Sequence, residues 1–129
     1  MKILVGFDGS EMNQRAISVA QKRAKSLNAQ LHVFTSAASA NGEKTKNSRL
    51  KTGLKDAEMM CRACGIDCKI IMSEQKQTPA ESILDYAAQN DIDEIVVGLR
   101  KKSQLGKLLF GSTARQVVLE APCPVLIVK

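Results

Sequence analysis

With 129 residues, the chain is long enough for one domain with a single hydrophobic core. Hydrophobic residues make up 44% and charged residues 25% of it, which excludes a wholly disordered chain, and no apolar run is long enough to cross a membrane. The net charge of +6 permits an anionic partner, but a chain with no Trp, one Tyr and three Phe lacks the aromatic residues expected of a nucleic-acid binder.

The N-terminal segment predicts a cytoplasmic protein. The apolar run at 2–5 passes directly to Gly6 and Asp8, whereas a signal peptide needs a longer apolar segment and a cleavage site. Three of the four cysteines fall within 61–68, which is a poor framework for disulfides. We therefore expect one cytoplasmic domain over 1–129 that does not insert into a membrane.

The first half of the chain alternates apolar runs with segments of helical period. The pattern predicts a buried strand at 2–7, a turn at Asp8-Gly9-Ser10 and a helix at 11–27. A second strand is expected at 31–35. The polar segment 36–49 follows, and its low hydrophobicity favours a mobile loop.

The second half continues the alternation. Apolar residues from Leu50 to Cys64 recur at steps of four, three, four and three, which defines one face of a helix, and Gly65 ends it. The remaining elements are expected to be a strand at 67–73, a helix that opens with a capping box at Thr78-Pro79-Ala80-Glu81, a strand at 94–99, a helix at 112–121 and a strand at 124–128.

Five strands separated by four helices predict an α/β fold, a Rossmann-like open parallel sheet with helices on both faces. We expect the strand order 3-2-1-4-5, in which the order reverses between the first and fourth strands. Ligands of such sheets bind at the carboxyl ends of the strands beside this reversal. Asp8 and Gly98, which end those two strands, would then face one crevice.

The segment 95–113 has the features of a phosphate site. An apolar run breaks at Gly98, and Gly111 precedes the next helix, so main-chain N–H groups can approach an anion without a Cβ in the way. Arg100 and Lys101, followed by two further lysines, place positive charge between the two glycines. No Walker A or Gly-x-Gly-x-x-Gly motif is present, which argues against an ordinary nucleotide hydrolase or dinucleotide oxidoreductase.

Several stretches together resemble the universal stress protein family over essentially the whole chain. They are Ile-Leu-Val-Gly-Phe-Asp8-Gly9-Ser10, Leu-His32-Val33, Pro79-Ala-Glu-Ser-Ile-Leu, the span from Gly98 to Gly111-Ser112, and Ala-Pro-Cys123-Pro-Val-Leu-Ile-Val. The nucleotide-binding branch of that family carries Gly-x2-Gly-x9-Gly-[Ser/Thr]. Gly98 and Gly111-Ser112 match this pattern, while Lys101 stands in place of the middle glycine.

The resemblance implies a fold like that of the adenine nucleotide alpha hydrolases, with ATP, AMP or ADP as cofactor and Mg²⁺ at the phosphates. Asp8, in its turn with Gly9 and Ser10, would lie beside the ribose or the metal ion, and the backbone of Val33 would read the adenine edge. Gly98 would pass beneath the ribose. Donors to the phosphates would come from Gly111, Ser112 and Thr113, with Arg100 and Lys101 beside them. Lys101 either pairs with a phosphate or closes the site.

Simpler interpretations stay open for most of these residues. Asp8 is also a common turn former before glycine, and the basic residues at 100–102 also suit a solvated loop. Cys61, Cys64 and Cys68 form Cys-x2-Cys-x3-Cys, but their places on a helix and a strand favour core packing over metal or thiol chemistry. We expect His32 to be packed, and Met59, Met60 and Met72 to be core or near-core residues.

No nucleophile, base and orienting acid occur at a recognisable spacing, so no catalytic residue is assigned. The leading hypothesis is a dimeric stress-response sensor or regulator that binds ATP and acts on an unknown protein partner. The alternatives are a nucleotide-free scaffold that acts through protein contacts, and a weak ATPase or autokinase. The resemblance implies a homodimer in which the strand at 124–128 pairs with its symmetry mate, and the apolar character of this strand, which is expected at a sheet edge, agrees with that.

Overall fold

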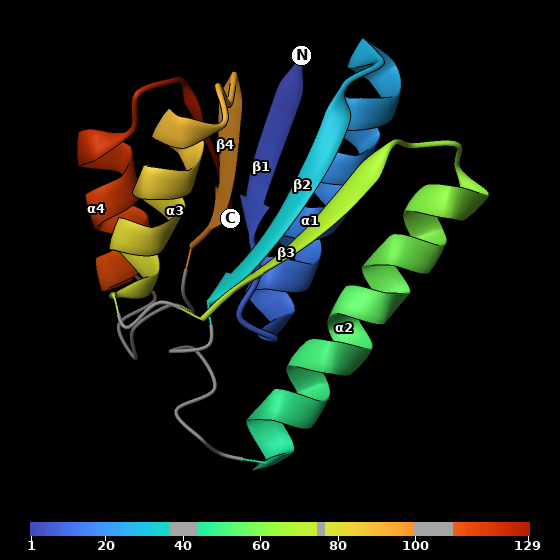
Figure 1. Ribbon diagram of the computed structural model, residues 1–129, viewed down its shortest axis with the longest axis horizontal. Coiled ribbons are helices and arrows are strands. Elements are labelled where there is room, and N and C mark those ends of the chain that lie inside the picture. Colours follow the sequence, from blue (N-terminus) through green and yellow to red (C-terminus); the bar gives the residue numbers. More distant parts are fainter. Residues whose placement is uncertain (37–43, 75–76, 100–109) are drawn as a thin grey trace.

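The computed structural model describes residues 1–36, 44–74, 77–99 and 110–129. A parallel sheet lies at its centre, with helices on both faces (Figure 1). The strand order β3-β2-β1-β4-β5 is the expected one, and every neighbouring pair is parallel. The elements are β1 (Lys2–Gly6), α1 (Glu11–Leu27), β2 (Gln30–Ser36), α2 (Lys44–Ala63), β3 (Cys68–Ser73), α3 (Pro79–Gln89), β4 (Glu94–Gly98), α4 (Ser112–Glu120) and β5 (Val125–Val128). Among the described helices, none is long and apolar enough to span a membrane.

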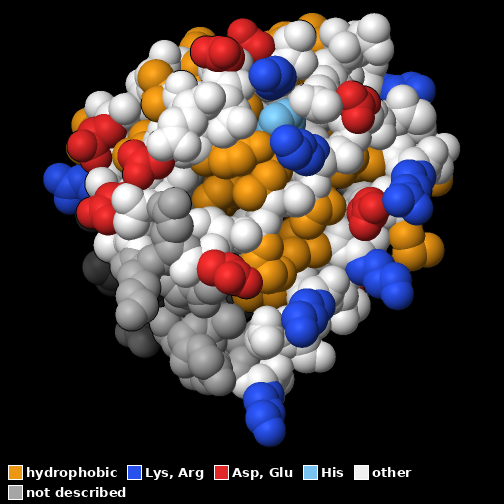
Figure 2. Space-filling model, viewed as in Figure 1, with side chains coloured by type: hydrophobic (Ala, Val, Ile, Leu, Met, Phe, Trp, Pro, Cys, Tyr) orange, Lys and Arg blue, Asp and Glu red, His pale blue; other side chains and the backbone are white. Residues whose placement is uncertain are grey.

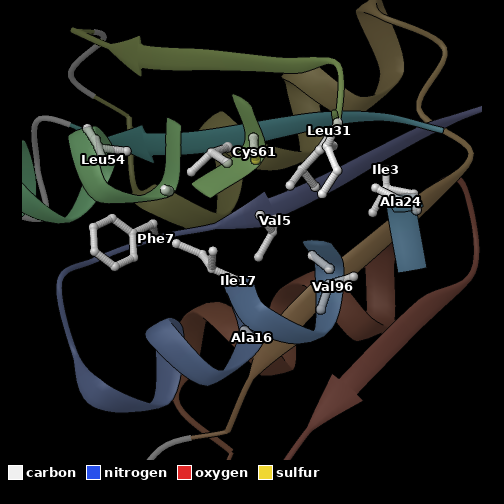
Figure 3. Close-up of a cluster of buried hydrophobic side chains, with 14 of the residues drawn as sticks. Ile3, Val5, Phe7, Ala16, Ile17, Ala24, Leu31, Leu54, Cys61 and Val96 are labelled. Atoms are coloured by element: carbon white, nitrogen blue, oxygen red, sulfur yellow. The ribbon is translucent and has the colours of Figure 1, made fainter. Parts of the chain in front are cut away.

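Successive side chains of each strand enter two apolar cores, one on each face of the sheet. On one face, Val5 of β1 packs with Ile17 of α1 and Leu54 of α2; Figure 3 shows these side chains converging from the three elements. On the other face, Leu4 of β1 packs with Ile83 of α3 and with residues of α4. The sheet is therefore buried on both sides, as its continuous apolar strands require.

The two helix pairs cover the sheet unequally. In Figure 1, α3 and α4 lie over the β1–β4 side of their face, and β2 and β3 extend beyond them, although Tyr86 of α3 still contacts His32 and Phe34 of β2. Figure 2 shows the result: apolar side chains occupy the middle of this face, and the single histidine, His32, lies at their border. His32 itself is buried, as expected, because Tyr86 of α3 reaches its ring.

Helix starts follow the capping rules that the sequence indicates. The Ser10 hydroxyl accepts from the N–H of Asn13 at 3.3 Å and caps α1. At α3, Thr78 and Glu81 each accept the other's backbone N–H, so the predicted capping box is confirmed. These caps satisfy N–H groups that have no partner inside the helix.

The start of α2 differs from the prediction. The expected loop 36–49 is wrong over its last part, because α2 begins at Lys44, and 37–43 lies outside the described residues. The segment 44–49 is polar and carries no apolar period, so nothing in it marks a helix. Once the helix has formed from Leu50 onward by packing on the sheet, however, it can extend toward Lys44 without a new nucleation step.

The three methionines expected near the core are exposed instead. Met59, Met60 and Met72 are 61%, 54% and 45% exposed. Met59 comes nine positions after Leu50, which is two and a half helical turns, so it lies on the opposite side of α2 from the packed face. Cys64 is exposed as well, because α2 has already ended at Ala63.

Candidate functional site

The turn between β1 and α1 is held by a compact set of hydrogen bonds. The Asp8 carboxylate accepts the N–H of Ser10 at 2.9 Å, and the Asn13 side-chain oxygen accepts the N–H of Asp8 at 2.6 Å. Gly9 between them has φ of +87°, a conformation that side-chain-bearing residues rarely adopt. Asp8 therefore acts as a turn former in this structure, and its exposed carboxylate keeps a second oxygen for other contacts.

Gly98, at the end of β4, packs directly against the first turn of α1. A Cβ added at this position would lie 2.8 Å from the carbonyl oxygen of Met12 and 3.4 Å from the side-chain nitrogen of Asn13. Only glycine allows that approach without a shift of backbone. Because β4 pairs with β1, the end of β4 lies beside the first turn of α1, which follows the turn at Asp8.

Gly111 begins α4 without a side-chain cap. Its φ of −65° and ψ of 160° are extended, and its carbonyl accepts the N–H of Arg115 at 2.9 Å. Gly111 has no side chain to cap the first turn, and within the described part of the chain no cap bond to its N–H groups, which include those of Ser112 and Thr113, is formed. Ser112 is exposed, and Ala114 anchors the helix in the core beside α3. This helix start can therefore offer donors and a positive dipole end to an anion.

Val33 is placed differently from the other predicted site residues. It is fully buried in β2, where its Cα partners are Val5 on one side and Ile70 on the other. The N–H of Leu31 bonds to Asp67 on the β3 side, and alternation along the strand turns the backbone of Val33 the same way. Its main-chain groups thus lie inside the sheet, three residues before the end of β2 at Ser36.

Arg100 and Lys101 lie outside the described residues. The structure gives the two ends of their segment. Leu99 is buried and donates its N–H to Val128 at 2.9 Å, while Phe110 is half exposed just before α4. The segment that carries Arg100 and Lys101 therefore connects the end of β4 to the start of α4.

Asn13 is a site residue that the sequence reasoning missed. Its side chain lies between the Asp8 turn and Gly98. The side-chain oxygen accepts the N–H of Asp8 and so faces the turn, which leaves the side-chain nitrogen on the side of Gly98. The signal was available, since Asn13 follows the cap Ser10 by three positions, where capping boxes carry a polar residue.

The remaining reactive side chains are poorly suited to catalysis. His32 bonds through Nδ1 to the Tyr86 hydroxyl at 2.8 Å and through Nε2 to Gln30 at 2.6 Å, and burial together with the nearby Lys69 and Lys2 lowers its pKa. Burial and contact with Cys61 raise the pKa of the Cys68 thiol to about 12. Within the described ranges, no three metal-ligating side chains gather in one place. The raised pKa keeps the Cys68 thiol protonated at neutral pH, which makes it a weak nucleophile.

Comparison with known proteins adds a family to this geometry. A sequence model described as the universal stress protein family matches residues 1–129. A universal stress protein of Thermus aquaticus is 36% identical, with 98% of this chain and 97% of the relative covered. Among solved structures, a universal stress protein from Archaeoglobus fulgidus has a TM-score of 0.86 at 30% identity, covering 100% of this chain and 98% of that one. A universal stress protein from Archaeoglobus fulgidus in complex with dAMP has a TM-score of 0.80 at 27% identity, with the same coverage.

Proposed function

Because this chain belongs to the universal stress protein family, we propose that it binds an adenine nucleotide, with ATP as the leading ligand and AMP or ADP as alternatives. The observation that carries the proposal is the approach of Gly98 to Met12, which sets the end of β4 beside the turn at Asp8. The similar Archaeoglobus fulgidus protein in complex with dAMP supports it, since that ligand is also an adenine nucleotide.

The phosphates would lie at the start of α4. The uncapped N–H groups of Ser112 and Thr113 are suitable donors there, and the positive end of the helix dipole adds attraction. Arg100 and Lys101 belong to the adjoining segment and would add positive charge. In this account, the ammonium of Lys101 pairs with a phosphate as a point charge, in place of the close backbone approach that a middle glycine provides.

The ribose side of the nucleotide would contact the turn of Gly9 and Ser10. The free oxygen of the Asp8 carboxylate can accept a ribose hydroxyl or ligate Mg²⁺, which prefers oxygen donors and phosphate together. We assign the adenine edge to Val33 on the family pattern alone, because its main-chain groups lie within the sheet.

The regulatory part of the proposal rests on β5. This strand is at the edge of the sheet, and its side chains are partly open: Ile127 is 37% exposed. Pairing of 124–128 with a second copy would cover that edge and form a homodimer. Nucleotide occupancy would then set which protein partner the dimer contacts.

Lys101 favours a second candidate function. If its side chain fills the place of the middle glycine, the crevice closes and the protein acts as a nucleotide-free scaffold through protein contacts. A slow ATPase or autokinase is the third candidate, and its turnover would depend on Asp8. An Asp8→Ala variant that leaves turnover unchanged excludes that candidate.

Calorimetric titration with ATP and Mg²⁺, and separately with AMP, tests the proposal. We expect saturable heat and an increase in the thermal midpoint, because a ligand that binds only the folded state stabilises it. The absence of both at millimolar nucleotide contradicts nucleotide binding and supports the scaffold. Nucleotide carried through purification, released by denaturation and identified by chromatography, would show which nucleotide is bound.

A further inference from the structure

A second hollow lies on the other side of the β1–α1 turn, between that turn and α2. This cleft has a volume of about 680 Å³ and is bordered by Gly9 and Gln14 on one side and by α2 from Lys44 to Asp56 on the other. Gly9 lies against Leu50 of α2, to which an added Cβ would approach within 3.6 Å. Figure 1 shows the first turns of α2 at the end of the sheet where the strands finish. Gly9 is shared with the proposed ribose contact, but neither Gly98 nor any residue of α4 lines the cleft, so it adjoins the proposed nucleotide site without including the start of α4.

The side chains of the cleft are arranged by charge along α2. Lys44 and Arg49 give positive charge to its first part, and Asp56 gives a carboxylate to its far end. Seven residues separate Arg49 from Asp56, which is roughly 10 Å along a helix. The other polar side chains that line the cleft are neutral hydrogen-bonding groups, contributed by Thr45, Ser48 and Thr52 of α2 and Gln14 of α1.

This lining selects a class of ligand. The cations of Lys44 and Arg49, which line the same cleft, suit a phosphate, which arginine binds through paired N–H donors and lysine as a point charge. The carboxylate of Asp56 at the far end repels a second phosphate but accepts hydrogen bonds from hydroxyl groups. Among the described lining residues there is no aromatic side chain on which a base could stack, which argues against a nucleotide. The cleft is open, and the side chains of Lys44, Arg49 and Asp56 that border it are exposed.

We propose that this cleft is a second ligand site, which binds a phosphorylated sugar. Its phosphate pairs with Arg49 and Lys44, and its hydroxyl groups donate to Asp56 and exchange hydrogen bonds with the threonine and serine hydroxyls. Gly9 is part of the same wall, because its φ of +87° lets the turn run close to α2 without a side chain between them. The site exists only because α2 begins at Lys44, six residues before its apolar face.

Titration of the whole chain with glucose phosphate, glucose and inorganic phosphate tests this site, with calorimetry for affinity and the amide signals of Gly9 and Gly53 for location. We expect glucose phosphate to bind and to shift both signals, phosphate alone to bind at least about tenfold more weakly, and glucose to bind too weakly to measure. Equal affinity for phosphate and glucose phosphate would reveal an adventitious ion only and overturn the proposal, as would no binding at all.

Matched variants locate the binding. Arg49→Gln should weaken glucose phosphate at least about tenfold, the effect of losing a charge-assisted contact, whereas Lys51→Gln on the same helix but outside the cleft should change nothing. Asp56→Asn should weaken glucose phosphate and leave inorganic phosphate unaffected. Equal effects of Arg49→Gln and Lys51→Gln would overturn the site. AMP titrated into Arg49→Gln should bind as in the wild type, and loss of AMP binding there would show that the cleft is not separate from the nucleotide crevice.

Discussion

Gly98→Ala is the substitution that tests the geometry of the crevice most strictly. Its Cβ would lie 2.8 Å from the Met12 carbonyl oxygen and 3.2 Å from the carbonyl carbon, and both are backbone atoms that cannot rotate away. Overpacking of this kind costs about 1–3 kcal/mol. Alanine also restricts the unfolded chain, which offsets about 0.4–1 kcal/mol of that cost. This offset applies because Gly98 does not have a positive φ, so alanine can adopt its backbone conformation. We therefore expect a net loss of about 1–2 kcal/mol in the free energy of unfolding.

Gly6→Ala is the matched control. Its Cβ would lie 3.1 Å from the Cδ1 methyl group of Ile83, which is the flexible end of a side chain and can move. Urea and thermal unfolding of the three proteins should therefore rank Gly98→Ala as the least stable, with a midpoint roughly 3–8 °C below the wild type. A Gly98→Ala protein as stable as the Gly6→Ala protein would refute the close approach of β4 to α1.

Three further outcomes follow from other parts of the structure. Burial lowers the pKa of His32 below its ordinary value of 6.5, so the unfolded chain takes up a proton on His32 at a higher pH than the folded chain does. The free energy of unfolding should therefore be highest above pH 6.5 and fall as the pH drops below that value. In urea titrations, a His32→Gln variant should lose the part of this pH dependence that comes from His32. In a thiol-reagent assay on the native protein, the exposed Cys64 should react first and the Cys68 thiol, with a pKa of about 12, should react only on unfolding; an unchanged fast phase in Cys64→Ser would contradict this. Ile127→Lys on the edge strand should be a monomer by light scattering, while Leu27→Lys, at an exposed position of α1, should remain a dimer. A monomeric wild-type protein would refute the dimer.

The sequence predicted the architecture because the alternation of apolar runs and helical periods is strong throughout. The strand order is confirmed, and in it the end of β4 packs against the first turn of α1, at Met12 and Asn13. The capping box at Thr78 is also confirmed. Its signal is local, and its residue types at this spacing have one main structural use.

The errors arose where structure depends on neighbours rather than on local pattern. The polar first turns of α2 carry no period, so their helical conformation comes from the packed turns after Leu50. Met59 was misplaced by residue type, although its spacing from Leu50 already pointed to the exposed side. Asn13 carried a local signal as the third residue after the cap Ser10, whereas its place beside Gly98 depends on the pairing of β4 with β1.

Nucleotide binding at the start of α4 is the central claim, and calorimetric titration of ATP with Mg²⁺ into Ser112→Glu tests it most directly. Ser112 is exposed at the first position of the helix, where a glutamate favours folding through the helix dipole, so lost binding cannot be ascribed to unfolding. The account predicts that Ser112→Glu binds the nucleotide at least about tenfold more weakly than the wild type, because the new carboxylate repels the phosphates. The control Ser18→Glu, at an exposed position of α1, should bind it as the wild type does. Equal nucleotide affinity of the two variants would contradict the phosphate site.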